Sequence, residues 1–88
     1  MGPSGALLLT NAICKRIPAP IVKKESTVGA GDSMVAGMAF MLLHGKSLIE
    51  VVQFGVACGT AATMNAGSQL CKKEDAWRLF EWIKAHTT

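Results

Sequence analysis

Charged residues are scarce in this 88-residue chain: Asp, Glu, Lys and Arg together make up 17% of it, and the net charge is only +3. The basic residues stand mainly in separated pairs, at Lys15–Arg16, Lys23–Lys24 and Lys72–Lys73, without aromatic residues between them. A nucleic-acid-binding surface typically combines a concentrated basic patch with aromatic side chains. The sequence therefore predicts no nucleic-acid partner, although its mild positive charge favours an anionic ligand.

Cysteines and long apolar runs are also few. Three cysteines are an odd number without C-x-x-C spacing, which argues against a zinc site or a disulfide framework and favours reduced thiols. The longest apolar run, residues 34–43, is about half a membrane span. The N-terminus lacks the positive segment of a signal peptide. We therefore expect a cytoplasmic protein with no membrane partner.

The sequence contains few polar residues for its length. Half of the residues are hydrophobic and the mean hydropathy is +0.33, which is high for one small domain. Residues 34–43 are apolar nearly all round a helix, which predicts burial on every side. A hairpin and two further helices are too few to provide that cover. We therefore expect a homo-oligomer, association through apolar helices, or a piece of a larger body.

The pattern of apolar and turn residues predicts an α/β segment with a β-hairpin, an extended stretch and three helices. Ser47 and Glu50 form a capping box at the start of the second helix, and Gly45 is expected to end the first. An apolar stripe on the third helix contains Ala76, Trp77, Phe80 and Ile83. The expected strands span 5–10 and 12–17, the extended stretch 18–27, and the helices about 31–45, 47–65 and 74–86.

The stretch Gly29-Ala30-Gly31-Asp32 leads directly into the first expected helix. Small residues leave the first amide hydrogens of a helix uncovered, and the helix dipole makes that end attractive to an anion. A carboxylate there has two interpretations. Asp32 is either a general base beside a phosphoryl group, or simply the N-cap of the helix. No Walker A loop is present, and Met34 occupies the place of the third glycine of G-x-G-x-x-G.

The stretch STVGAGDSMVAG, residues 26–37, resembles the C-terminal signature of the PfkB (ribokinase-like) family of carbohydrate kinases. FGVACGTAATMNAGSQLC, residues 54–71, resembles the adenine-side helix and following loop of that family, most of all its 6-phosphofructokinases. The resemblance extends over residues 1–88. It implies that these residues are the C-terminal nucleotide-binding and catalytic segment of a ribokinase-like domain, without its N-terminal part and lid.

The resemblance also implies roles for individual residues. Asp32 matches the family's catalytic base, and the backbone amides of Gly29, Ala30 and Gly31 match its anion hole. Magnesium accompanies ATP in the family, and many members bind a monovalent cation, usually potassium. The positions that match the ATP site are Lys24, Thr27, Val56 and Thr60. The positions that match the cation site are Ser26, Val28, Ala62, Asn65, Gly67 and Gln69.

The expected activity is ATP-dependent phosphorylation of a sugar phosphate, with fructose 6-phosphate converted to fructose 1,6-bisphosphate in glycolysis. The family's N-x-x-E motif, which organises magnesium, does not occur here, so the 88 residues alone are expected to be inactive. The alternative is a non-catalytic fragment that associates with itself or with the missing half.

Several conspicuous residues have structural interpretations. His44 is expected to cap helix carbonyls, Trp77 and Trp82 to pack, and Cys58 and Cys71 to fill small apolar spaces. The methionines at 34, 38 and 41 are expected in the core rather than at a metal.

Overall fold

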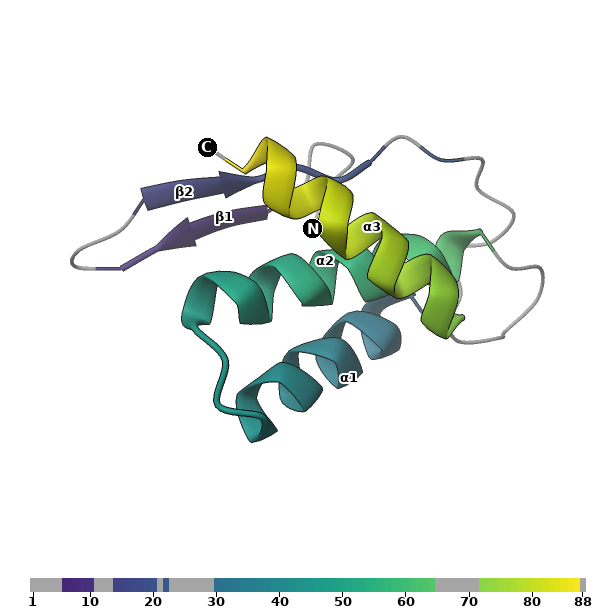
Figure 1. The fold of residues 1–88 in the computed structure, drawn as a ribbon, viewed down its shortest axis with the longest axis horizontal. Helices are drawn as coiled ribbons and strands as arrows, with labels where there is room; N and C mark the ends of the chain where they lie inside the picture. The colour runs from purple at the N-terminus through teal and green to yellow at the C-terminus, as the bar shows by residue number, and fades with distance from the viewer. Residues whose placement is uncertain (1–5, 11–13, 21, 23–29, 65–71, 88) are drawn as a thin grey trace.

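The computed structural model describes residues 6–10, 14–20, 22, 30–64 and 72–87 (Figure 1). Strands β1 (Ala6–Leu9) and β2 (Cys14–Ile17) pair antiparallel, with Ala6 opposite Ile17. Side chains alternate across this pair, so Leu8 and Ile17 are buried while Leu7 and Leu9 are exposed. The predicted hairpin is confirmed, although residues 11–13 between its strands lie outside the described residues.

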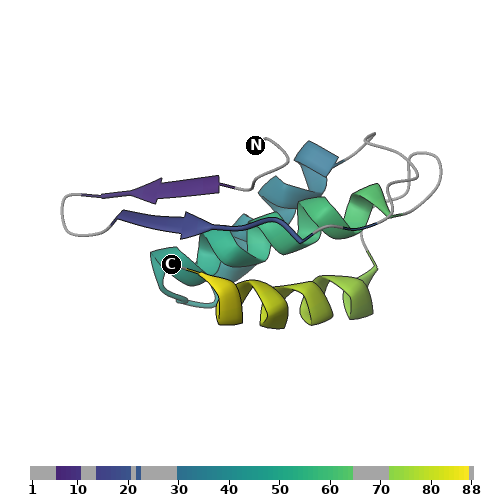
Figure 2. The same ribbon diagram turned by 90° about the horizontal axis from the view of Figure 1, so that it is seen from above.

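Three helices follow the hairpin: α1 (Ala30–Leu43), α2 (Leu48–Thr63) and α3 (Lys73–His86). Helix α2 lies between α1 and α3, and it also contacts both strands (Figures 1 and 2). Every residue of α2 from Gln53 to Thr63 is consequently buried. The start of α1, the end of α2 and the start of α3 lie at the same end of the molecule (Figure 1). No helix in the described ranges has both the length and the apolarity to cross a membrane.

The first helix ends as its sequence predicts. Gly45 has a φ of +69°, a conformation that glycine adopts without a Cβ penalty, and its N–H donates to the Leu42 carbonyl at 3.1 Å. The Nδ1 of His44 donates to the Phe40 carbonyl at 2.8 Å, so the capping role predicted for this histidine is confirmed.

Helix α2 begins at a capping box. The Glu50 N–H donates to Ser47 Oγ at 3.3 Å, and Ser47 Oγ donates to the Glu50 carboxylate at 3.1 Å. Ser47→Ala removes both contacts, so we expect the free energy of unfolding to fall by about 1 kcal/mol. Urea denaturation followed by circular dichroism measures this loss. Ser47→Asp is the matched control and should retain most of the stability; an equal loss in both variants would contradict the capping role.

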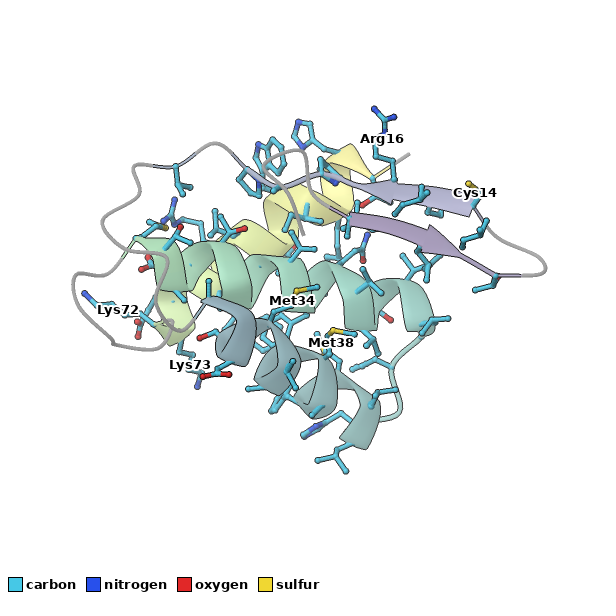
Figure 3. All side chains as sticks on the ribbon, turned by 180° about the vertical axis from the view of Figure 1, so that it is seen from behind. Cys14, Arg16, Met34, Met38, Lys72 and Lys73 are labelled. Atoms are coloured by element: carbon cyan, nitrogen blue, oxygen red, sulfur yellow. The ribbon has the colours of Figure 1, made fainter. Side chains whose placement is uncertain are left out.

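Helices α1 and α2 approach closely at two levels. A Cβ on Gly37 would lie 2.7 Å from Sγ of Cys58, and a Cβ on Gly55 would lie 2.5 Å from Cγ of Met38. Both distances are shorter than atoms tolerate, so each glycine is required for the contact. Cys58 is buried there, as predicted, whereas Cys71 lies outside the described residues. Figure 3 shows Met38 on the side of α1 that faces α2.

The prediction that α1 is buried on all sides is wrong for these residues. Its buried side consists of Ser33, Gly37 and Met41, which face α2. Its outer face is uncovered because neither the hairpin nor α3 extends over it. That face exposes 67% of Val35, 42% of Phe40, 59% of Leu42 and 87% of Leu43. Met41 and Met38 belong to the core or pack against it, while Met34 is half-buried.

Helix α3 starts one residue before the predicted position. One residue of its buried side differs from the predicted apolar stripe. Ala76, Phe80 and Ile83 are buried as expected, but Trp77 remains 37% exposed. Leu79 is buried in its place, which the sequence analysis did not predict. Trp82 packs on His86, with ring centroids 4.0 Å apart.

Candidate functional site

Asp32 lies in the first turn of α1 with an exposed side chain. The helix begins at Ala30, so Asp32 is its third residue and not its N-cap; that alternative is wrong. Within the described ranges, no hydrogen bond or ion pair engages the Asp32 carboxylate. The carboxylate is therefore available to accept a proton or to bind a ligand.

Ala30 and Gly31 open the same helical turn. The first amides of a helix have no carbonyl partner within the helix, so these N–H groups are free to receive an anion. Around Gly31, no described atom outside its own helical backbone lies within 4 Å of the position a Cβ would take. The turn therefore combines uncovered amides with open space beside one carboxylate, which suits stabilisation of a transferred phosphoryl group.

The candidate residues on α2 are buried. Val56 and Thr60 are one helical turn apart on one face, with exposures of 0% and 5%. The Thr60 carbonyl also accepts a hydrogen bond of 2.6 Å from the hydroxyl of Thr63. Ala62 is fully buried, and its carbonyl accepts the N–H of Met64. These residues sit at the end of α2 that lies beside the start of α1 (Figure 1).

The remaining candidates lie outside the described residues. They are Lys24, Ser26, Thr27, Val28, Gly29, Asn65, Gly67 and Gln69. The structure therefore brings together Ala30, Gly31 and Asp32 on α1, near the end of α2. It neither supports nor opposes the contacts expected for the other positions. In the described part of the chain, no three His, Cys, Asp or Glu residues are grouped closely enough to hold a metal ion.

Sequence reasoning missed a groove of about 480 Å³ between the helices. Ser33 from α1, Phe54 from α2, and Lys73 and Trp77 from α3 are among the residues that line it. The sequence analysis assigned Trp77 to packing, and nothing in the local pattern indicates that Lys73 and Ser33 line one groove. Only the packing of three separate helices creates this site.

Comparison with known proteins connects this arrangement to a group of enzymes. A family model described as "pfkB family carbohydrate kinase" matches residues 1–75. ATP-dependent 6-phosphofructokinase isozyme 2 of Escherichia coli is 46% identical over 83 residues, which cover 94% of this chain and 27% of the relative. The chain thus spans about a quarter of that relative's length.

Solved structures agree with the sequence comparison. Phosphofructokinase-2 from E. coli, in a complex with potassium, has a TM-score of 0.87 and 45% identity, over 93% of this chain and 26% of that one. Ribokinase from Thermotoga maritima has a TM-score of 0.78 and 28% identity, over 90% of this chain and 27% of that one. The hairpin and three helices are therefore part of a ribokinase-like α/β fold, and the chain belongs to the pfkB family of carbohydrate kinases.

Proposed function

We propose that this chain is the C-terminal nucleotide-binding and catalytic segment of an ATP-dependent sugar-phosphate kinase. The observation that carries the proposal is the first turn of α1, where an exposed Asp32 without a described partner adjoins uncovered amides. A general base and an anion-stabilising backbone are the two groups that phosphoryl transfer to a hydroxyl requires from this position. The pfkB family match over residues 1–75 supports the same assignment.

In the proposed reaction, Asp32 accepts the proton of a sugar hydroxyl as its oxygen attacks the γ-phosphorus of ATP. A new P–O bond forms, the bond to the β-phosphate oxygen breaks, and ADP leaves with that electron pair. The amides of Gly29, Ala30 and Gly31 stabilise the negative charge on the transferred group. Lys24, Thr27, Val56 and Thr60 are proposed contacts of the nucleotide, the last two through the buried face of α2.

The proposed metals have unequal support from the described residues. A magnesium ion prefers carboxylate oxygens and phosphates, and the described residues offer no acidic cluster for it. Its ligands are therefore expected outside the described residues. The monovalent cation site would use carbonyls near Ser26, Val28, Asn65, Gly67 and Gln69, together with Ala62. The potassium complex of the E. coli structure supports that choice of ion.

The proposed acceptor is fructose 6-phosphate, giving fructose 1,6-bisphosphate in cytoplasmic glycolysis. The name of the E. coli relative supports a sugar phosphate acceptor. The competing interpretation, a non-catalytic fragment, explains the uncovered outer face of α1 but gives no role to Asp32. In a complete kinase, we propose that the part of this face formed by Val35, Leu42 and Leu43 packs against the remaining part of the enzyme, so activity must be tested with that part present.

The test is a fusion kinase in which this chain replaces the matching 83-residue segment of E. coli isozyme 2. We expect its kcat for fructose 6-phosphate and magnesium–ATP to lie within about tenfold of the parent enzyme, a difference of about 1.4 kcal/mol in activation free energy. A coupled assay for ADP measures it. The 88-residue chain alone should form no ADP, because it lacks the acceptor-binding part.

The control is the E. coli enzyme with the same segment deleted, which should be inactive. A folded fusion kinase that binds ATP and fructose 6-phosphate without producing ADP would overturn the proposal. Turnover by the isolated 88-residue chain would overturn the expectation that the acceptor site lies elsewhere.

A further inference from the structure

The groove found between the three helices has the size of a small-molecule site. Its volume of about 480 Å³ lies within the range of pockets that hold organic ligands. Helices α1 and α3 form its two walls, with Gly37 and Phe40 on one side and Trp77 on the other. Phe54 and Cys58 of α2 form its floor. Every described residue of its lining therefore belongs to one of the three helices.

The groove lies on the opposite side of α2 from the proposed nucleotide contacts. Successive residues of a helix are rotated by about 100°, so Val56 and Thr60 point about half a turn away from Phe54 and Cys58. The described candidates on α2, which are Val56, Thr60 and Ala62, do not line the groove. An occupant of the groove would therefore not compete with ATP for these residues.

The two ends of the groove differ chemically. At one end, the rings of Phe54 and Trp77 are 4.7 Å apart, and Phe40 meets Trp77 edge-on at 6.4 Å. Such a cluster offers faces and edges to another flat ring. At the other end, Lys73 lies near Ser33, and both line the groove. The groove thus has an aromatic end and a hydroxyl-and-ammonium end.

Among the described residues of the lining, Lys73 is the charged one, and it makes no ion pair with any described carboxylate. The nearby Asp75 pairs instead with Arg78 at 3.3 Å. Figure 3 shows Lys73 on the side of α3 that faces the start of α1, whereas Lys72 projects away from the helices. The net charge of the lining is consequently positive, which complements an anionic ligand group.

From these observations we propose that the groove is a second ligand site, which binds a small amphipathic carboxylate. Its flat apolar body lies against the rings of Phe40, Phe54 and Trp77, and its carboxylate lies at Lys73. The site adds a binding function that is independent of the proposed phosphoryl transfer.

The test uses Trp82→Phe, which leaves Trp77 as the single tryptophan, and follows its fluorescence with excitation at 295 nm. The probe is 4-phenylbutanoate, compared with neutral 4-phenylbutanol and cationic 4-phenylbutylamine. We expect saturable binding of the carboxylate with a Kd of about 1 mM, in line with the affinity of ligands this small. The alcohol should bind about three- to tenfold more weakly, and the amine more weakly still.

Matched variants test the position of the site. Lys73→Gln should weaken 4-phenylbutanoate about three- to tenfold, while Lys72→Gln, which removes the adjacent charge outside the groove, should change it less than about twofold. Ala36 lines the groove and is exposed, so Ala36→Phe should fill the groove and weaken binding about tenfold or more. Circular dichroism checks that each variant keeps its helices.

Several results would overturn the proposal. They are the absence of saturable binding, equal affinity for the acid and the alcohol, equal effects of Lys73→Gln and Lys72→Gln, or unchanged binding in helical Ala36→Phe. The titration is also repeated in the fusion kinase by NMR, with indole 15N label on tryptophan. Loss of binding there would identify the groove as a packing surface for the rest of the kinase, which contradicts a ligand site.

Discussion

Asp32→Asn is expected to lower the kcat of the fusion kinase by about 10²–10⁴-fold, the contribution typical of a general base. Asparagine has nearly the same size and shape as aspartate, but its amide does not accept the proton of the attacking hydroxyl. The KM for ATP should change little, because the nucleotide is held by other residues. Steady-state kinetics with varied ATP and fructose 6-phosphate measure both constants.

The chain offers a closely matched control for this substitution. Asp75 is the third residue of α3, as Asp32 is the third residue of α1, and both carboxylates interact with a helix N-terminus. Asp75→Asn should leave kcat unchanged, because this side chain pairs with Arg78 and lies on another helix. Similar losses of kcat in both variants would indicate a helix-stability effect and would contradict the role of Asp32 as the base.

Gly37→Val is expected to lower the free energy of unfolding of the 88-residue chain by about 2–4 kcal/mol. A Cβ at this position would meet Sγ and Cβ of Cys58 at 2.7 and 3.0 Å, and the Phe54 carbonyl oxygen at 3.2 Å. The first contact can be relieved by rotating the cysteine, but the other two involve atoms fixed to the α2 backbone. The helices must therefore separate, and the apolar contacts along them weaken.

Gly31→Val is the matched control, because it places the same side chain in the same helix. At this position, a Cβ would have no described atom within 4 Å other than those of its own helical backbone. Its stability should stay within about 0.5 kcal/mol of the parent chain, as at other open surface positions. Urea denaturation followed at 222 nm compares the two variants. Equal losses of unfolding free energy in the two variants would contradict a stabilising role of the close contact between α1 and α2.

Local sequence signals predicted the elements of this fold well, because each signal acts within a few residues. The capping box at Ser47, the terminal glycine at position 45 and the capping histidine at 44 all depend on hydrogen bonds across one helical turn. Gly37 carries a signal of the same kind: a glycine inside a helix costs about 1 kcal/mol relative to alanine, and here it allows the close approach of Cys58.

Features that depend on distant elements were predicted less well. The periodicity of α1 indicates apolar residues on every face, but it contains no information on which face a neighbour covers. For the same reason, the periodicity of α3 predicted Trp77 on its buried side, where the structure has Leu79 instead. The groove is the extreme case, because Ser33 and Lys73 are 40 positions apart and line the same groove only because α1 and α3 both pack on α2.

For the candidate site, glycines followed by aspartate predicted an anion-binding turn at the start of a helix, and the family resemblance suggested its chemical role; both stay predictions. The placement of Asp32 inside the helix required the structure, because aspartate is favoured both at an N-cap and in a first turn.

The two glycine contacts between α1 and α2 have a mechanical consequence. Gly37 against Cys58 and Gly55 against Met38 bring the helices close together at two separate levels, so tilting or sliding one helix drives side chains into the partner, and spreading the helices loses their close packing. Asp32 stands on one of these helices and Val56 and Thr60 on the other. Any opening or closing movement of the complete kinase is therefore expected to carry the proposed base and the proposed nucleotide contacts together as one rigid piece, with the hinge located outside this helix pair.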